Sequence, residues 1–223
     1  MIIRGNRQYM TAETAETAVA PDPAPGTAER ILDAAEDLFA ARGYTATTMG
    51  DVAARVGIRT PSLYNHFRNK EALYEAVLER LLATFTAPLA SLSGAPVTQA
   101  RILEWLEATV RQHHANPNLA RLLQHAALSG GPQTGQLIDR LFRPMFRPAS
   151  EADMQEEGIS QLQQAGLQPW AVMAFNNLVM SYVTMAPMYR DLLGQDPFSE
   201  TALENQLKLV KTLLQAVLEY RGR

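Results

Sequence analysis

The sequence contains no cysteine among its 223 residues. Disulfide bridges and thiolate metal sites are therefore excluded, and the composition fits a reducing compartment. Long apolar runs are missing as well, because no segment approaches the roughly 18 to 20 apolar residues that span a bilayer. Residues 1–9 also lack the apolar core of a signal peptide. We therefore expect a soluble, cytoplasmic protein that makes no membrane contact.

Signatures of catalysis are missing too. The chain has no Gly-x-Ser-x-Gly sequence, no phosphate-binding Walker sequence and no evident cluster of metal ligands. His113, His114 and His125 raise the question of a metal, but adjacent histidines on a helix point about 100° apart. No further ligands accompany them, so we expect no zinc site. The sequence predicts neither an enzyme nor a cofactor.

Neither sign of charge dominates, since the formal net charge is −3 at pH 7. This total argues against a protein that coats nucleic acid without specificity. A basic stretch is nevertheless hidden within it, because Val52 to Lys70 contains four basic side chains and no acidic one. These are Arg55, Arg59, Arg68 and Lys70, interleaved with the hydrogen-bonding residues Thr60, Ser62, Tyr64, Asn65 and His66. The pattern favours contacts to base edges and phosphates over the alternative, a solvated charged face.

Apolar residues recur at helical intervals over most of the chain. Residues 1–26, rich in Ala, Thr, Glu and Pro, form the exception, and we expect a disordered tail there. From Thr27 onward the spacing is helical, and Gly43 fits a left-handed cap at the end of the first helix. Proline and glycine divide the remainder into further helices. We predict an all-α fold of about nine helices.

Residues 51–67 match the spacing of a helix-turn-helix. The apolar positions are Val52, Val56, Ile58 and Leu63. Ala53 is small enough for a second helix to cross close over it, and Gly57 suits the left-handed turn between the helices. Thr60 with Pro61 is expected to begin the second helix. We assign residues 27–73 to this domain, a fourth helix to about residue 92, and residues 97–223 to a second helical domain.

Several short segments occur in this order: AERILDAA from Ala28, Gly43-Tyr44, Thr47-Thr48, Val52-Ala53 through Gly57, and SLYNHFRNKEAL from Ser62. Together they closely resemble the N-terminal domain of TetR-family regulators. The resemblance covers residues 28–73 and includes the Leu-Tyr-x-His-Phe-x-x-Lys run that begins at Leu63. It implies a homodimer that binds double-stranded DNA at a palindromic operator, and a repressor that a small molecule releases.

The resemblance also implies roles for single residues. Phosphate contacts would come from Thr48, Tyr64, His66 and Lys70, and base contacts from Arg59, Thr60, Ser62 and Asn65. Two positions depart from the family, which usually has serine at Arg59 and a small residue at Pro61, so the start of the second helix is shifted. Arg59 can bind guanine with two hydrogen bonds, worth about 1 to 3 kcal/mol of discrimination, or hold a phosphate. The base preference therefore stays open.

The C-terminal helices suggest a dimer. Trp170 to Tyr189 is apolar nearly all round and is expected to form a central, buried helix. In the last helix, one apolar stripe recurs at alternating spacings of four and three. It consists of Leu203, Leu207, Val210, Leu214 and Val217, and Leu209 with Leu213 forms a second stripe. Two stripes need two partners, and the resemblance implies that one is a second subunit. We assign the first stripe to the dimer interface, the alternative being packing within one subunit.

Aromatic and polar residues of three further segments could line an apolar pocket with a few polar groups. They are Trp105, Thr109 and His113, then Phe142 and Phe146, and finally Phe175, Asn176 and Met180. Each of them also fits an ordinary packed core. We expect a small apolar ligand in this pocket. The alternative is a DNA-binding protein of the same fold that is regulated by a protein partner, and such a protein would have a filled core.

Overall fold

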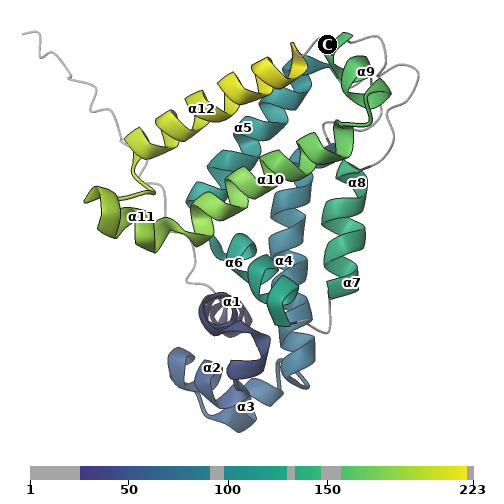
Figure 1. Ribbon diagram of the computed structural model, residues 1–223. Coiled ribbons are helices and arrows are strands. Elements are labelled where there is room, and N and C mark those ends of the chain that lie inside the picture. Colours follow the sequence, from purple (N-terminus) through teal and green to yellow (C-terminus); the bar gives the residue numbers. More distant parts are fainter. Residues whose placement is uncertain (1–25, 91–97, 130–133, 147–156, 220–223) are drawn as a thin grey trace, which may run out of the picture.

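The computed structural model describes residues 26–90, 98–129, 134–146 and 157–219, which form helices joined by short turns (Figure 1). These residues contain no strand, which confirms the predicted all-α fold. The expected tail over residues 1–26 lies outside the described residues except for Gly26, the N-cap of the first helix. The expected loop over Ser91 to Pro96 lies outside them entirely.

The N-terminal elements are α1 (Thr27–Ala46), α2 (Met49–Val56), α3 (Thr60–Tyr64) and α4 (Lys70–Ala90). They are followed by α5 (Gln99–Ala115), α6 (Asn118–Ser129), α7 (Thr134–Leu137), the π-helical turn η1 (Ile138–Phe142), α8 (Arg143–Met145) and α9 (Glu157–Gln164). The last are α10 (Gln168–Thr184), α11 (Ala186–Leu193) and α12 (Glu200–Leu218). With α7, η1 and α8 taken as one continuous segment, the described residues form 11 helices. The sequence predicted about nine helices, with a single helix from Trp170 to Tyr189. The structure divides that segment into α10 and α11, because Pro187 in the first turn of α11 cannot continue the preceding helix.

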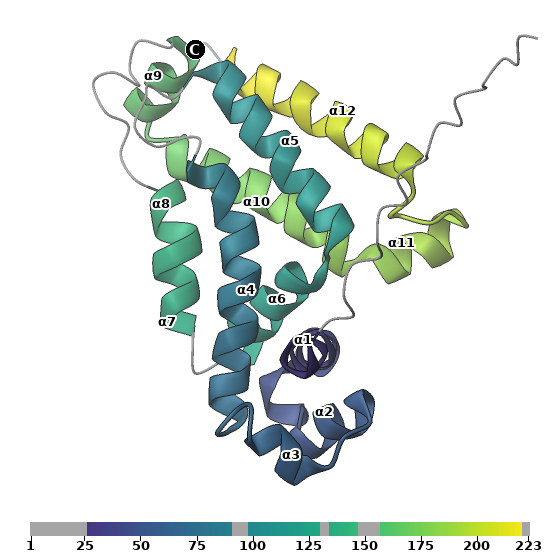
Figure 2. The same ribbon diagram turned by 180° about the vertical axis from the view of Figure 1, so that it is seen from behind.

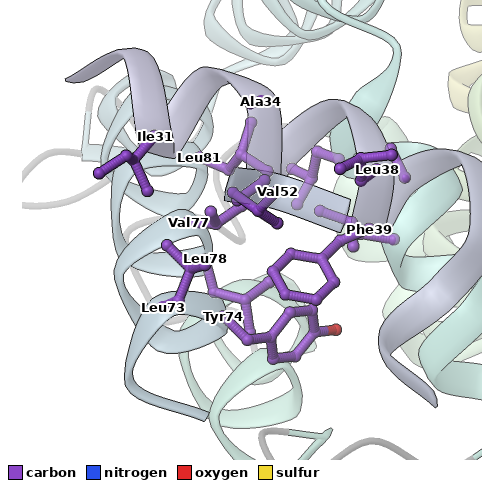
Figure 3. Close-up of a cluster of buried hydrophobic side chains, with 14 of the residues drawn as sticks. Ile31, Ala34, Leu38, Phe39, Val52, Leu73, Tyr74, Val77, Leu78 and Leu81 are labelled. Atoms are coloured by element: carbon purple, nitrogen blue, oxygen red, sulfur yellow. The ribbon is translucent and has the colours of Figure 1, made fainter. Parts of the chain in front are cut away.

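The core of the N-terminal part lies between α1, α2 and α4 (Figure 3). Phe39 of α1 meets Tyr74 of α4 edge to face, with the ring centroids 5.0 Å apart. Val52 of α2 and Leu78 of α4 are fully buried in the same cluster. Burying one such side chain contributes about 1.5 to 3 kcal/mol relative to leaving it exposed. This core fixes the orientation of α2 relative to α4, and Leu63 of α3 is buried in the same cluster.

Helix α1 bends at Gly43 instead of ending there. Gly43 has a φ of +77° and a ψ of 172°, which lies outside the left-handed helical conformation predicted for a cap, and the helix resumes and continues to Ala46. The Thr47 hydroxyl donates to the Gly43 carbonyl at 2.9 Å and stabilises the bend. A Cβ at Gly43 would lie 3.0 Å from Nδ1 of His125 on α6. The absence of a side chain therefore allows α6 of the C-terminal part to approach α1.

The C-terminal helices are arranged around α5. Both α10 and α12 pack against it, and α9 lies against the end of α12 (Figures 1 and 2). Helix α4 extends from the N-terminal helices into this layer, and α3 lies at the end of the molecule away from α12. Within the described ranges, we find no helix with the length and hydrophobicity needed to traverse a bilayer.

Candidate nucleic-acid interface and ligand pocket

Helix α2 and the turn after it are fixed by local hydrogen bonds. The Thr48 hydroxyl accepts a hydrogen bond from the Asp51 amide at 3.1 Å, and the Asp51 carboxylate accepts one from the Thr48 amide at 2.9 Å. This capping box satisfies donors at the helix start. Gly57 ends the helix with φ +77° and ψ 32°. Ala53 is buried, as the crossing of the two helices requires.

Helix α3 begins one residue earlier than the sequence predicted. Arg59, not Thr60, is its N-cap, because the Arg59 carbonyl accepts from the amides of Ser62 at 2.9 Å and Leu63 at 3.3 Å. Pro61 lies in the first turn, where its missing amide hydrogen costs nothing. Leu63 is the buried residue of α3 and anchors it to the N-terminal core.

The other side chains of this region face outward. Of the expected base-reading residues, Arg59, Ser62 and Asn65 are exposed and Thr60 is half-buried. Of the expected phosphate-binding residues, Thr48, Tyr64 and His66 are exposed and Lys70 is half-buried. Seven of the eight lie from Arg59, the N-cap of α3, to Lys70, the first residue of α4, and Thr48 is the N-cap of α2. Their individual roles stay predictions.

The basic side chains of this region differ in their partners. Arg55 pairs with Asp37 of α1 at 3.2 Å. The Lys70 ammonium donates to the carbonyls of Tyr44 at 3.0 Å and Thr47 at 3.1 Å, so it already joins the start of α4 to the end of α1. Arg59 and Arg68, by contrast, have no ion-pair partner in the part of the chain that the structure describes. Their two guanidinium groups are available to an anionic partner.

A buried carboxylate links the N-terminal and C-terminal parts. Glu36 of α1 is almost fully buried, and its carboxylate lies 2.6 Å from the Arg80 guanidinium on α4. The side-chain amides of Asn116, the C-cap of α5, and Asn118, the first residue of α6, donate to the same carboxylate at 2.8 and 3.0 Å. Sequence reasoning missed this network. The only available signal was a carboxylate directly beside the apolar stripe of α1.

An apolar cavity of about 40 Å³ lies between α4, α5, α6 and α10, and η1 closes one side. Six of the eight residues predicted from the sequence line it: Trp105, Thr109, His113, Phe175, Asn176 and Met180. Sequence reasoning missed the rest of the lining, which is Phe85, Leu106, Leu119, Leu123, Leu141 and Val179. The helical spacing of most of these residues in the sequence is the same as that of ordinary core residues, so spacing alone does not single them out.

Phe142 and Phe146 are not among the residues that line the cavity, which corrects their assignment. Phe142 packs against the N-terminal core cluster, and Phe146 is exposed. Leu137 and Leu141 are the buried residues of this segment. The segment contains the π-helical turn η1, in which the backbone hydrogen bonds span five residues. A register taken from α-helical spacing therefore selects the wrong face.

His113 is the most unusual polar group of the cavity. His113 is only 5% exposed, and its Nδ1 atom is buried without a hydrogen-bond partner among the residues that the structure describes. The ring packs on Phe85 of α4, with centroids 4.6 Å apart. Burial, with a smaller contribution from neighbouring His114, lowers the pKa of His113 to about 4. The imidazole is therefore neutral near pH 7.

The predicted dimer stripe of α12 lies inside the subunit, and its assignment is corrected accordingly. Val210 and Leu214 are buried in a cluster with residues of α5 and α9, and Val217 packs against that cluster. Leu203 and Leu207 are buried with Val110 of α5 and Val179 of α10. Side chains covered by their own subunit are not available to a second one. Intramolecular packing, the alternative considered for the sequence, describes this stripe.

The other stripe of α12 remains uncovered. Leu209 is 52% exposed and Leu213 is 40% exposed. On α10, Trp170 is 66% exposed and Met173 is 43% exposed. Ala174, directly after Met173 on α10, is also exposed, and its small side chain allows another helix to approach closely. Large apolar side chains on two helices of one layer are typical of a protein interface.

The described residues contain no group of three or more histidine, cysteine, aspartate or glutamate side chains placed to hold a metal ion. His114, next to His113, instead lies against Gln206, with its Nε2 atom 2.5 Å from the Gln206 side-chain oxygen. His125 packs beside Gly43. The three histidines considered for a metal thus lie in separate packing environments.

Comparisons with known proteins agree with this geometry. Residues 31–77 match the model of the bacterial regulatory proteins of the tetR family. The HTH-type transcriptional repressor KstR2 of Mycolicibacterium smegmatis is 36% identical over 106 residues, 41% of this chain and 52% of the relative. The regulator RutR of Escherichia coli K12 is 32% identical over 102 residues, 46% and 48% of the two chains. The chain thus spans about half the length of these curated relatives.

The fold comparison extends further along the chain. A crystal structure of a TetR family transcription regulator from Marinobacter aquaeolei superimposes with a TM-score of 0.55 at 19% identity. The superposition covers 83% of this chain and 94% of that one. The two proteins share a fold over most of their length. Sequence similarity to KstR2 and RutR, by contrast, covers less than half of this chain.

Proposed function

We propose that this chain, whose residues 31–77 match the model of the bacterial regulatory proteins of the tetR family, is a homodimeric transcriptional repressor that binds a palindromic operator. A small apolar molecule releases it from DNA. The observation that carries the proposal is the exposed face of α3, with Arg59, Ser62 and Asn65 followed by Arg68, which has no ion-pair partner among the described residues. No acidic residue occurs between Val52 and Lys70. Such a face is suited to the major groove, where hydrogen-bonding side chains read base edges and basic ones hold phosphates.

The uncovered face of α10 and α12 supports the dimer. If Trp170, Met173, Leu209 and Leu213 pack against the same residues of a second subunit, the contact is two-fold symmetric. A two-fold dimer presents its two α3 helices to successive major grooves, about 34 Å apart. The operator is then an inverted repeat. One copy of the five-residue α3 would hold DNA weakly, so dimerisation supplies both affinity and specificity.

The cavity supports a ligand-controlled equilibrium. Its walls include Phe85 of α4, the helix whose first residue, Lys70, follows α3. A ligand that binds better to a wider cavity favours a conformation in which α4 is displaced. The Glu36 carboxylate joins α1 to Arg80 of α4 and to Asn116 after α5, so a shift of α4 or α5 reaches the DNA-binding helices. Release from DNA follows when the two α3 helices no longer match the groove spacing.

The small size of the cavity supports a second candidate function. A volume of about 40 Å³ is well below the roughly 150 Å³ of a cavity that binds benzene. A DNA-binding protein regulated by a protein partner would need no larger cavity. Mass spectrometry of small molecules extracted from purified protein separates the two, since a stoichiometric bound compound supports the ligand and its absence supports the partner.

Selection from a random pool of duplex DNA, at a stated salt concentration, tests the proposed function. Salt must be fixed because phosphate contacts make affinity strongly salt-dependent. The expected result is an enriched inverted repeat with half-sites about one helical turn apart. The double variant with Arg59→Ala and Ser62→Ala is expected to enrich this inverted repeat less than the wild type does. A pool without enrichment, from protein stripped of small molecules, would overturn the proposal.

A further inference from the structure

The cavity between α4, α5, α6 and α10 has no charged wall. Among the described residues that line it there is no lysine, arginine, aspartate or glutamate. Nine are apolar and the remaining three are Thr109, His113 and Asn176. An ionised ligand would therefore lose its hydration without meeting a counter-charge, and burying an isolated charge is strongly unfavourable. This excludes carboxylates and ammonium compounds as good ligands.

The three polar residues are not equally available. The Thr109 hydroxyl already donates to the Trp105 carbonyl at 2.9 Å. Asn176 is only half-buried and does not bear the full cost of a missing partner. His113, in contrast, is almost completely buried, and its Nδ1 atom has no hydrogen-bond partner within the described part of the chain. An unpartnered buried nitrogen is unfavourable by itself, so a ligand that bonds to it gains affinity.

The neutral imidazole defines which group suits this position. With the pKa of His113 lowered by burial, one ring nitrogen is a donor and the other an acceptor near pH 7. A hydroxyl group both donates and accepts, so it satisfies Nδ1 in either tautomer. A carboxylate only accepts, and a hydrocarbon does neither. The apolar walls from Phe85, Trp105 and Phe175 favour a flat ring as the body of the ligand.

Size sets a further limit. The cavity holds about 40 Å³, so even one aromatic ring requires the walls to move apart. Met180 is a flexible side chain in the wall and can yield to such a ring. Larger polycyclic compounds would require the helices themselves to separate widely. The geometry thus favours compact ligands.

We propose that the cavity is a site for a neutral, single-ring aromatic alcohol whose hydroxyl group hydrogen-bonds to His113 while the ring packs between α4, α5 and α10. This inference rests on the proposed function, because it specifies the chemistry of the ligand that releases the regulator. It also assigns His113 as the residue that selects hydroxylated rings over plain hydrocarbons.

Three probes of similar shape test it: p-cresol, p-xylene and p-toluate, which offer a hydroxyl, no polar group and a carboxylate. The chain has two tryptophans, and Trp105 lines the cavity whereas Trp170 is exposed. Fluorescence of the full-length Trp170→Phe variant therefore reports on the cavity alone. At pH 7.5, p-cresol is expected to bind saturably, about fivefold tighter than p-xylene, since one hydrogen bond separates them. For p-toluate we expect affinity at least about tenfold below that of p-cresol.

The His113→Phe substitution is expected to abolish the preference for p-cresol over p-xylene. His114→Phe is the matched control, because it makes the same change at the adjacent histidine, which lies against Gln206 and is not among the residues that line the cavity, and it is expected to keep the preference. The ranking of the three probes on protein that retains His113 does not depend on whether either of these variants folds.

Tighter binding of p-toluate than of p-cresol, or no saturable binding of any probe at millimolar concentration, would overturn the inference. If the protein still selects an inverted repeat from DNA, such a result would reject only the proposed ligand class and leave the proposed function standing. Probe binding without any selected DNA sequence would instead overturn the proposed function and leave the cavity chemistry intact.

Discussion

Arg80 of α4 holds the buried carboxylate of Glu36 on α1, with 2.6 Å between guanidinium nitrogen and carboxylate oxygen. A second guanidinium nitrogen of Arg80 lies 2.6 Å from Asp33, which is exposed. Asn116 and Asn118 donate to Glu36 from the other side. Three segments far apart in sequence thus meet at one charge. A buried pair of this kind is costly to break because the remaining charge loses its compensation.

Removing the Glu36 charge should therefore destabilise the protein. Glu36→Gln keeps the size of the side chain but leaves Arg80 only the exposed Asp33, and we expect the free energy of unfolding to fall by about 3 kcal/mol. The matched control is Asp33→Asn, for which we expect a loss below about 1 kcal/mol because that pair is solvated. Urea unfolding monitored by circular dichroism measures both. Equal losses for the two variants would argue against a buried network at Glu36.

Charge placed on the uncovered face of α12 should dissociate the dimer. Leu209→Glu puts a carboxylate where an apolar side chain is expected to meet the second subunit, and we expect monomers by sedimentation velocity at micromolar concentration. Leu128→Glu makes the same change at an exposed leucine of α6, and we expect it to remain dimeric. If Leu209→Glu were as dimeric as the control, the interface would lie elsewhere.

His113 should make stability depend on pH. The ordinary histidine pKa of 6.5 applies to the unfolded chain, whereas the folded protein protonates His113 only near a pKa of about 4. The unfolded state therefore binds more protons between these values, and the free energy of unfolding decreases as the pH falls from 6.5 toward 4. The contribution at pH 5 is about 2 kcal/mol.

The comparison that isolates this contribution is His113→Phe, which removes the titrating group. Between pH 7 and pH 5, the free energy of unfolding of this variant is expected to fall by about 2 kcal/mol less than that of the wild type, as measured by urea unfolding. His66 is exposed on the DNA-binding side, so His66→Phe should retain the full pH dependence. A wild type and a His113→Phe variant with parallel pH profiles would contradict the assignment.

Substitutions on α3 should separate base contacts from phosphate contacts. Arg59→Ala and Thr60→Ala are expected to weaken binding to the selected operator by about 1 to 3 kcal/mol and to change binding to unrelated DNA less. Lys70→Ala is expected to weaken both. Arg143→Ala, in α8, serves as the control and should change neither. Fluorescence anisotropy at fixed salt measures these affinities, and equal losses on all sequences for every α3 variant would remove the assignment of base readers.

The sequence predicted the local structure of α2 and α3 well because local rules determine it. Thr48 with Asp51 and Gly57 act within a few residues, and burial of Leu63 follows from its spacing. The error at α3 was a single position, since Arg59 and Thr60 are both compatible with a helix start before Pro61. Local hydrogen bonds, visible only in the structure, decide between them.

The C-terminal part was predicted less well because spacing reveals that a side is buried but not what buries it. The stripe with Leu207 and the stripe with Leu209 have the same helical period, and α5 covers the first one. The π-helical turn shifts Phe142 out of register without any sequence signal. Glu36 finds its partners at Arg80 and Asn116, too far along the chain for a local pattern to connect them.

The most direct test of the account is sedimentation of the wild-type protein with the selected operator duplex and with a scrambled duplex of the same composition. We predict two subunits on each operator duplex and an affinity at least about a thousandfold above that for the scrambled one. The operator preference should fall sharply in Arg59→Ala. A single subunit on each duplex, or equal affinity for both sequences, would contradict a dimeric regulator that reads DNA through α3.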